Sequence, residues 1–107
     1  MVFRVKFRPR AELDLETLFR HLVQETPLHA AEWVSGLEEA ILSLREMPER
    51  CLAVRRFSRP AIAVRQLLYG RYPHVCKVYF TIEPKTVWIL HIRHGARREP
   101  SRRELLG

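Results

Sequence analysis

Arginine supplies most of the side chains in this sequence that could do chemistry. Sixteen of the nineteen basic residues are arginines, and a guanidinium group suits bidentate contacts to phosphate or carboxylate as well as stacking on bases. The charge is uneven, because residues 51–107 hold twelve basic and three acidic residues whereas residues 11–50 hold three basic and nine acidic ones. This distribution indicates a polyanionic or acidic partner, with a merely solubilising surface charge as the alternative.

The cysteines and histidines do not follow a pattern typical of a metal site or a disulfide framework. Cys51 and Cys76 lie far apart, with no Cys-x-x-Cys motif and no histidine-rich spacing. His91 and Cys76 lack a third ligand at a suitable spacing. We therefore expect no metal, no cofactor and no disulfide, which suits a reducing cytoplasm.

Composition and length favour one soluble domain. The 107 residues are 47% hydrophobic and 29% charged, as in ordinary globular proteins, and this length suits a single core. No apolar run approaches the roughly 20 residues that cross a bilayer, and the first six residues alternate instead of forming the apolar block of a signal peptide. We expect a single domain over residues 1–107, located in the cytoplasm without a membrane partner.

The first half of the sequence predicts a strand followed by two helices. Residues 2–8 alternate between an apolar face and a basic face, which is typical of a half-buried strand; the basic face consists of Arg4, Lys6 and Arg8. Apolar residues then recur every three or four positions, first after Pro9 and again from Ala30 to Met47. Thr26 and Pro27 are typical of a helix start. The short joint predicts a helical hairpin.

The second half predicts an antiparallel sheet. Residues 48–61 show no sustained period and predict a long loop that is either mobile or functional. Residues 62–69, 74–82 and 87–94 are strand candidates joined by short turns. The predicted fold class is α+β, a two-layer sandwich of order β-α-α-β-β-β. Its helical hairpin packs on one face of a mainly antiparallel sheet, and residues 95–107 follow as a basic tail.

The sheet face opposite the helices is expected to be exposed and basic. The candidate target-binding or nucleic-acid-binding residues are Arg4, Lys6, Lys77, Tyr79, Arg93, Arg97 and Arg98. Tyrosines can stack on bases, although Tyr69, Tyr72 and Tyr79 more often fill a sheet edge or hairpin. Trp33 and Trp88 have spacings typical of core residues.

A set of short motifs also runs in order along most of the chain. The motifs are Pro9-Arg10-Ala11-Glu12-Leu13-Asp14-Leu15, Thr26-Pro27, Ala30-Ala31, Leu37, Leu44-Arg45-Glu46-Met47-Pro48, Arg65 with Gly70 and Tyr72, and Ile89-Leu90-His91-Ile92-Arg93-His94-Gly95-Ala96-Arg97. Together they resemble the RelE/ParE superfamily of type II toxin-antitoxin toxins, and the ending favours the ParE-like, plasmid-stabilisation branch.

The resemblance implies a small bacterial growth inhibitor that forms an oligomer with a cognate acidic antitoxin. RelE-like members are ribosome-dependent, metal-independent endoribonucleases that cut messenger RNA, whereas ParE-like members inhibit DNA gyrase and lack those catalytic groups. In the nuclease branch the resemblance implies that Arg65 holds the scissile phosphate and that His94 exchanges a proton. The alternatives are an arginine paired with a helix acid and a satisfied strand-end histidine.

One departure from the nuclease pattern favours gyrase as the target. Nuclease members use a C-terminal tyrosine, but no tyrosine follows Tyr79 in this chain. Whether the protein is an enzyme stays open at this point. A third hypothesis is a nucleic-acid-binding module, or an inactive toxin retained as an antitoxin-binding scaffold.

Overall fold

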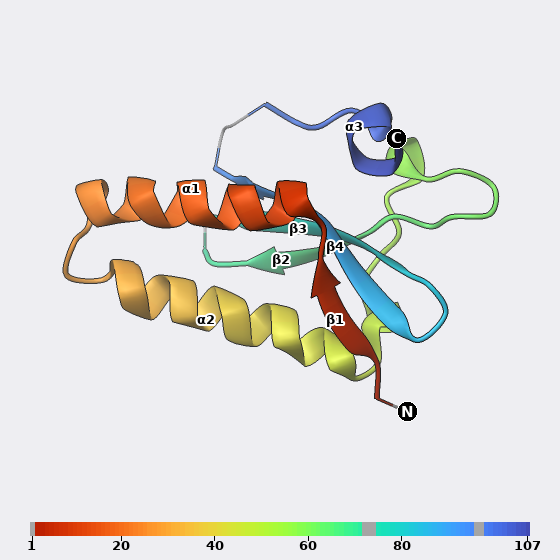
Figure 1. Cartoon of the computed structure of the whole chain (residues 1–107), viewed down its shortest axis with the longest axis horizontal. Helices are drawn as coiled ribbons and strands as arrows, with labels where there is room; N and C mark the ends of the chain where they lie inside the picture. The colour runs from red at the N-terminus through yellow and green to blue at the C-terminus, as the bar shows by residue number, and fades with distance from the viewer. Residues whose placement is uncertain (1, 72–74, 96–97) are drawn as a thin grey trace.

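The main elements follow the predicted order, with one short helix added at the C-terminus (Figure 1). The computed structural model describes residues 2–71, 75–95 and 98–107. Its elements are β1 (Arg4–Phe7), α1 (Pro9–Glu25), α2 (Ala30–Leu42), β2 (Arg65–Tyr69), β3 (Cys76–Ile82), β4 (Thr86–His94) and α3 (Arg102–Leu106). The sheet order is β1-β4-β3-β2, in which only β1 and β4 are parallel. The predicted α+β class and the mainly antiparallel sheet are confirmed.

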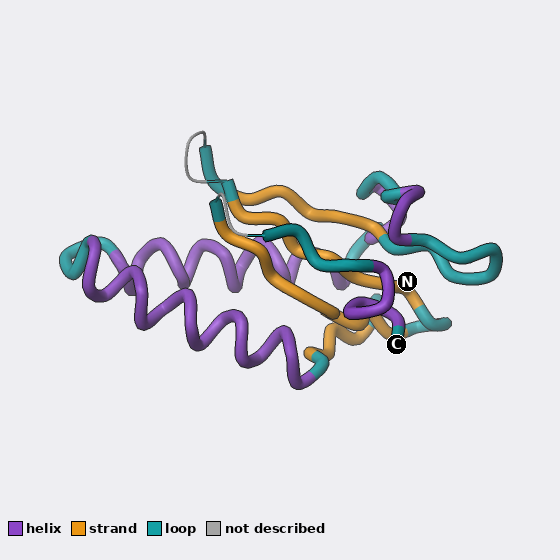
Figure 2. Tube along the Cα trace, turned by 90° about the horizontal axis from the view of Figure 1, so that it is seen from above, coloured by secondary structure: helices purple, strands orange, loops and turns teal. Residues whose placement is uncertain are grey.

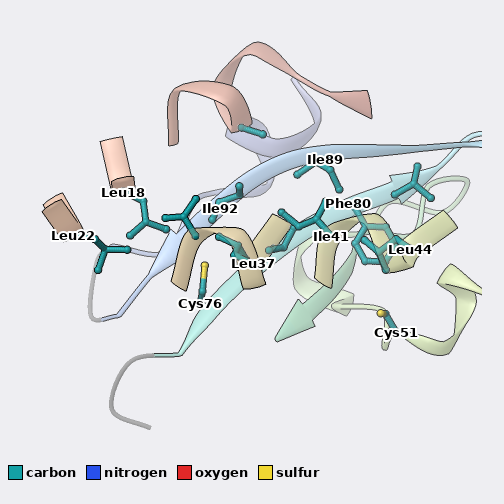
Figure 3. Close-up of a cluster of buried hydrophobic side chains, with 14 of the residues drawn as sticks. Leu18, Leu22, Leu37, Ile41, Leu44, Cys51, Cys76, Phe80, Ile89 and Ile92 are labelled. Carbon is teal, nitrogen blue, oxygen red and sulfur yellow. The ribbon is translucent and has the colours of Figure 1, made fainter. Parts of the chain in front are cut away.

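The larger core lies between the sheet and the two long helices (Figure 3). Pro9 starts α1 without losing a hydrogen bond, because the first helical N–H has no partner within the helix. The buried helix residues Leu18, Leu37 and Ile41 then meet Phe80 and Ile89 of the sheet. Seen from above, α1 runs alongside β4 (Figure 2). No helix in the described part of the chain is long and apolar enough to cross a membrane.

Helix α2 is shorter than its apolar spacing predicts. It ends at Leu42, and residues 43–45 tighten into a 3-10 turn. Met47 was predicted to belong to the helix, but it has a φ of 49° and is 71% exposed. The cause is Pro48, because a proline disfavours the right-handed helical conformation in the residue before it.

The opposite face of the sheet carries a second, smaller core, so the prediction of a fully exposed face is wrong. We call this the second cluster; its buried members are Val54, Phe57, Val64, Tyr79, Leu90 and Leu105. The segment predicted to be a long loop supplies Phe57 from a 3-10 turn at Arg55–Phe57. The predicted basic tail supplies Leu105 from α3, whose start is stabilised by a capping box between Ser101 and Glu104. Both segments therefore pack on the sheet.

A β-bulge in β4 changes which residues face the helices. Phe80 pairs with Ile89 and Tyr79 pairs with His91, so Leu90 is an extra residue in β4. As a result Ile89 and Ile92 both join the larger core although they are three residues apart. Strict alternation without a bulge would place Ile92 on the same face as Leu90.

Gly36 of α2 allows a close approach between this helix and β2. The Tyr69 hydroxyl donates to the Trp33 carbonyl at 3.2 Å, and a Cβ added at Gly36 would overlap that hydroxyl. Gly36→Ala is therefore expected to lower the free energy of unfolding by about 1 kcal/mol, because overpacking outweighs the better helix propensity of alanine. Urea unfolding measures the change.

Two variants test the cause assigned to the Gly36 effect. Tyr69→Phe removes the overlapping hydroxyl, so Gly36→Ala should cost less in that background than in the native chain. Ser35→Ala, at the neighbouring exposed position, should cause no loss. Equal costs of Gly36→Ala in the two backgrounds would contradict this explanation.

Candidate functional site

Strand β1 and the residue that follows it present a row of three exposed basic side chains, which we call the basic stripe: Arg4, Lys6 and Arg8. They alternate with Val5 and Phe7, which face the helices. Lys6 pairs in register with Trp88 of β4. The Arg8 guanidinium carbon lies 4.2 Å from the Trp88 ring centre, and the Lys6 ammonium lies 5.7 Å from it. Cation–π contacts of this kind orient the two cations but leave their N–H groups able to bind an anion.

Asp14 joins α1 to the edge of β4 beyond the end of β1. The Arg8 N–H donates to the Ile89 carbonyl at 2.9 Å, and β1 provides no partner beyond that point. Asp14 Oδ2 then accepts from the Ile92 N–H at 2.9 Å and lies 2.7 Å from His91 Nδ1. Asp14 Oδ1 accepts from Arg10 Nε at 2.9 Å. The carboxylate therefore replaces a missing strand partner.

The protonation of Asp14 follows from these contacts. Burial alone raises the pKa of a carboxyl group, because it disfavours the charged form. The hydrogen bonds from His91, the Ile92 N–H and Arg10 outweigh burial and hold the pKa of Asp14 below its ordinary value of 3.8. Asp14 is therefore an anion at neutral pH.

A pocket of about 220 Å³ opens beside this carboxylate. We call it the arginine-histidine pocket; its lining residues are Arg10, Asp14, Thr17, Leu18, His21, His91, Ile92, Arg93, His94 and Arg98. Three of these, Arg93, His94 and Arg98, were candidate site residues in the sequence. The residues from α1 were missed, although positions 10, 14, 17 and 21 share one helical face and spacing alone could have grouped them.

His94 lies at the helix-facing end of β4 among aromatic side chains. It pairs with Cys76, whose side chain belongs to the larger core. The His94 ring centre is 5.6 Å from Trp33 in an edge-on arrangement and 6.3 Å from His21. These contacts orient the imidazole towards α1 and α2.

Arg65 connects β2 to the segment that follows α2. Its guanidinium donates to the Cys51 carbonyl at 2.7 Å and to the Glu49 carbonyl at 3.3 Å. Arg65 is level with Phe80 of β3, whereas His94 is level with Cys76. The two levels are four residues apart along β3, which corresponds to a distance of roughly 13 Å along the strand. The two side chains predicted to act together in a nuclease are therefore not brought together.

The remaining candidate residues lie in different surroundings. Lys77 pairs in register with Arg93. Tyr79 is fully buried, and its hydroxyl has no hydrogen-bond partner among the residues that the structure describes. It packs edge-on against Phe57 at 5.2 Å, so it does not line an exposed face as expected. Arg98 is exposed and lies 3.1 Å from Glu104, while Arg97 is outside the described residues.

Neither cysteine provides a reactive thiolate. Burial raises the pKa of Cys76 to about 12 and also raises the pKa of Cys51. Both thiols are buried and free, so they stay protonated at neutral pH. Within residues 2–71, 75–95 and 98–107, no three His, Cys, Asp or Glu side chains form a group that could hold a metal ion.

Comparisons with known proteins agree with this architecture. Residues 5–99 match the family model described as ParE toxin of type II toxin-antitoxin system, parDE. A solved structure described as the chromosomal ParDE TA system from P. aeruginosa is similar, with a TM-score of 0.68 and 25% sequence identity. The match covers 88% of this chain and 97% of that chain. No significant match was found among curated proteins.

Proposed function

This chain belongs to the ParE toxin family of type II toxin-antitoxin systems, and on that premise we propose that it arrests bacterial growth by binding DNA gyrase and is neutralised by a cognate antitoxin. Family membership, established over residues 5–99, carries the proposal and confirms the resemblance found in the motifs. The fold adds support, because the similar ParDE structure is covered over 97% of its length.

The choice of gyrase over messenger RNA rests on the surroundings of two residues. A ribosome-dependent nuclease of the RelE kind needs an arginine and a general base around one phosphate. Here Arg65 donates to backbone carbonyls and His94 packs on Trp33, roughly 13 Å further along the strands. The sequence also lacks a tyrosine after Tyr79. These observations favour action through protein contact.

The basic stripe is our candidate for the gyrase contact. Arg4 and Lys6 are exposed on the edge strand β1 and Arg8 is exposed directly after it, and Trp88 contacts Lys6 and Arg8. Charged side chains on an edge strand discourage non-specific strand pairing, and a row of cations steers an acidic surface into place. We propose that an acidic surface of gyrase binds along β1.

Gyrase supercoiling assays test the proposal. The purified protein is expected to inhibit supercoiling at concentrations that stop growth, and a defined message translated in its presence should stay intact. The double variant Arg4→Gln/Lys6→Gln should inhibit less, whereas Arg20→Gln, on the exposed side of α1, should inhibit normally. Unchanged supercoiling would refute the gyrase target, and cuts at the ribosomal A-site codon would establish the nuclease alternative.

An apolar groove beside the basic stripe is our candidate for the antitoxin contact. It has a volume of about 630 Å³ and is lined by Val5, Lys6, Phe7, Glu12, Leu15, Glu16, Phe19, Val34 and Glu38. Phe19 is 40% exposed at this groove. We propose that an antitoxin segment fills the groove with apolar side chains, while acidic residues of the same antitoxin reach the basic stripe across β1.

Phe19→Asp should separate neutralisation from toxicity. The variant is expected to arrest growth like the native chain but to escape the co-expressed antitoxin, because a carboxylate replaces an apolar contact in an already acidic groove. Co-purification and growth curves measure the two properties. Leu28→Asp is the matched control, since Leu28 is 89% exposed outside the groove. Full neutralisation of Phe19→Asp would place the antitoxin elsewhere.

A further inference from the structure

The arginine-histidine pocket between α1 and the end of β4 has the chemistry of an anion site. Three guanidinium groups and three imidazoles line it, together with the Thr17 hydroxyl; they come from Arg10, Arg93, Arg98, His21, His91 and His94, and the His91 imidazole is bonded to Asp14. From this geometry we propose that the pocket binds one phosphate group. Planar guanidinium groups donate two parallel hydrogen bonds to phosphate oxygens, and imidazole and hydroxyl donors can complete the set.

The carboxylate in the pocket is already occupied by donors from the protein. Asp14 accepts from Arg10, from the Ile92 N–H and from His91. The lining holds three guanidinium groups against the single carboxylate of Asp14, so positive groups are in excess within the lining itself. Glu99 lies 3.9 Å from Arg93 and Glu104 lies 3.1 Å from Arg98. The pair between Arg98 and Glu104 is at the surface, where such pairs are weak and exchange readily.

Three lining residues, Arg10, Asp14 and His94, are oriented by protein contacts before any ligand binds. Arg10 Nε is bonded to Asp14, and the two terminal nitrogens of the same guanidinium carry further N–H donors. Asp14 is in turn bonded to the backbone of β4. The His94 ring is positioned by contacts with Trp33 and His21. Preorganised donors lower the entropy cost of binding a small anion.

The volume of the pocket limits the ligand. Pockets for drug-sized molecules span about 300–1,000 Å³, whereas this one is about 220 Å³. It therefore suits a phosphate group, and not the base and sugar of a nucleotide as well. The phosphate can be inorganic phosphate or the terminal phosphate of a nucleic acid. This site is independent of the proposed gyrase contact, which lies along β1.

Titration of the full chain with inorganic phosphate at constant ionic strength tests the proposal. Backbone and histidine side-chain NMR shifts are expected to saturate at Thr17, His21, Ile92 and His94. The double variant Arg10→Gln/Arg98→Gln should weaken binding by about tenfold, through loss of two charge-assisted contacts. Arg98→Gln alone should weaken it by about threefold, and it provides the test if the Arg10 change disturbs folding.

A matched control variant tests whether the pocket binds the phosphate, and a pair of competing DNA strands tests the source of that phosphate. Arg20→Gln, also on α1 but outside the pocket, should bind phosphate like the native chain. A short single-stranded DNA with a 5′-phosphate should compete with inorganic phosphate better than the same strand without it if the source is a nucleic-acid end. If the strand with the 5′-phosphate and the strand without it compete equally, the pocket is assigned to free phosphate. The proposal would be overturned if the NMR shifts do not saturate, or if they spread along the basic stripe. It would also be overturned if Arg20→Gln weakens phosphate binding as much as the pocket variants do. These outcomes do not depend on the result of the gyrase assays.

Discussion

Asp14→Ala is expected to lower the free energy of unfolding by about 3 kcal/mol, because it leaves two buried donors, the His91 imidazole and the Ile92 N–H, without an acceptor. The Asp14 side chain is 12% exposed and receives hydrogen bonds from His91, the Ile92 N–H and Arg10. The pairing between β1 and β4 ends at Phe7 and Ile89, so β1 does not reach Ile92. No other described strand lies on that side of β4 to accept a hydrogen bond from the Ile92 N–H. Urea unfolding at neutral pH measures the loss.

Asp14 should also give the protein a distinct pH dependence in acid. Its folded pKa is lower than the ordinary value of 3.8, so its contribution to stability is fully present above about pH 4. The contribution is then lost as the pH falls through the folded pKa, because the unfolded state takes up the proton first. Asp14→Asn cannot titrate and should flatten the stability curve between neutral pH and strong acid.

Glu16→Gln is the control for both Asp14 experiments. Glu16 lies on the same helix and pairs with Arg20 at 2.6 Å, but both side chains are mostly exposed. Exposed pairs of this kind contribute about 0.3–0.5 kcal/mol. If Asp14→Asn loses as little stability as Glu16→Gln, or keeps the acid dependence of the native chain, Asp14 does not hold α1 to β4 as described.

The sequence predicted the elements of this fold better than their contacts. Apolar spacing located β1, α1 and the three strands of the meander, because period two and period 3.6 are easily told apart. The bulge at Leu90 was not visible, since Trp88, Ile89, Leu90 and Ile92 are all apolar and any register buries some of them. The register decides the site, because it places His91 opposite Tyr79 and the Ile92 N–H opposite Asp14.

The candidate site was predictable only in part, for a related reason. Arg93, His94 and Arg98 were found from their residue types near the end of the last strand. Arg65 was a candidate phosphate ligand only for a nuclease, with a structural arginine paired to a helix acid as the alternative; in the structure its guanidinium is bonded to the carbonyls of Glu49 and Cys51. Backbone carbonyls are present at every position, so no sequence pattern reveals which of them an arginine will reach.

The second cluster was missed because its members lack a period. Val54 and Phe57 are irregularly spaced in residues 48–61, a segment with two prolines, so the pattern indicated a loop. In the structure, Val54 and Val64 are joined by a backbone hydrogen bond of 2.7 Å, and the segment lies against β2. Val54 and Phe57 are therefore buried members of the second cluster although the backbone around them is irregular.

Phe57→Ala is expected to lower the free energy of unfolding by about 3 kcal/mol, which is the usual cost of removing a buried aromatic side chain. Phe57 is 4% exposed and contacts Tyr79 edge-on, in the same cluster as Leu105 of α3. Arg55→Ala, in the same 3-10 turn but exposed, should change stability by less than about 0.5 kcal/mol. Urea unfolding distinguishes the two variants. A small loss for Phe57→Ala would mean that residues 48–61 fold separately from the sheet; the expected loss would make them, together with α3, part of one cooperative core.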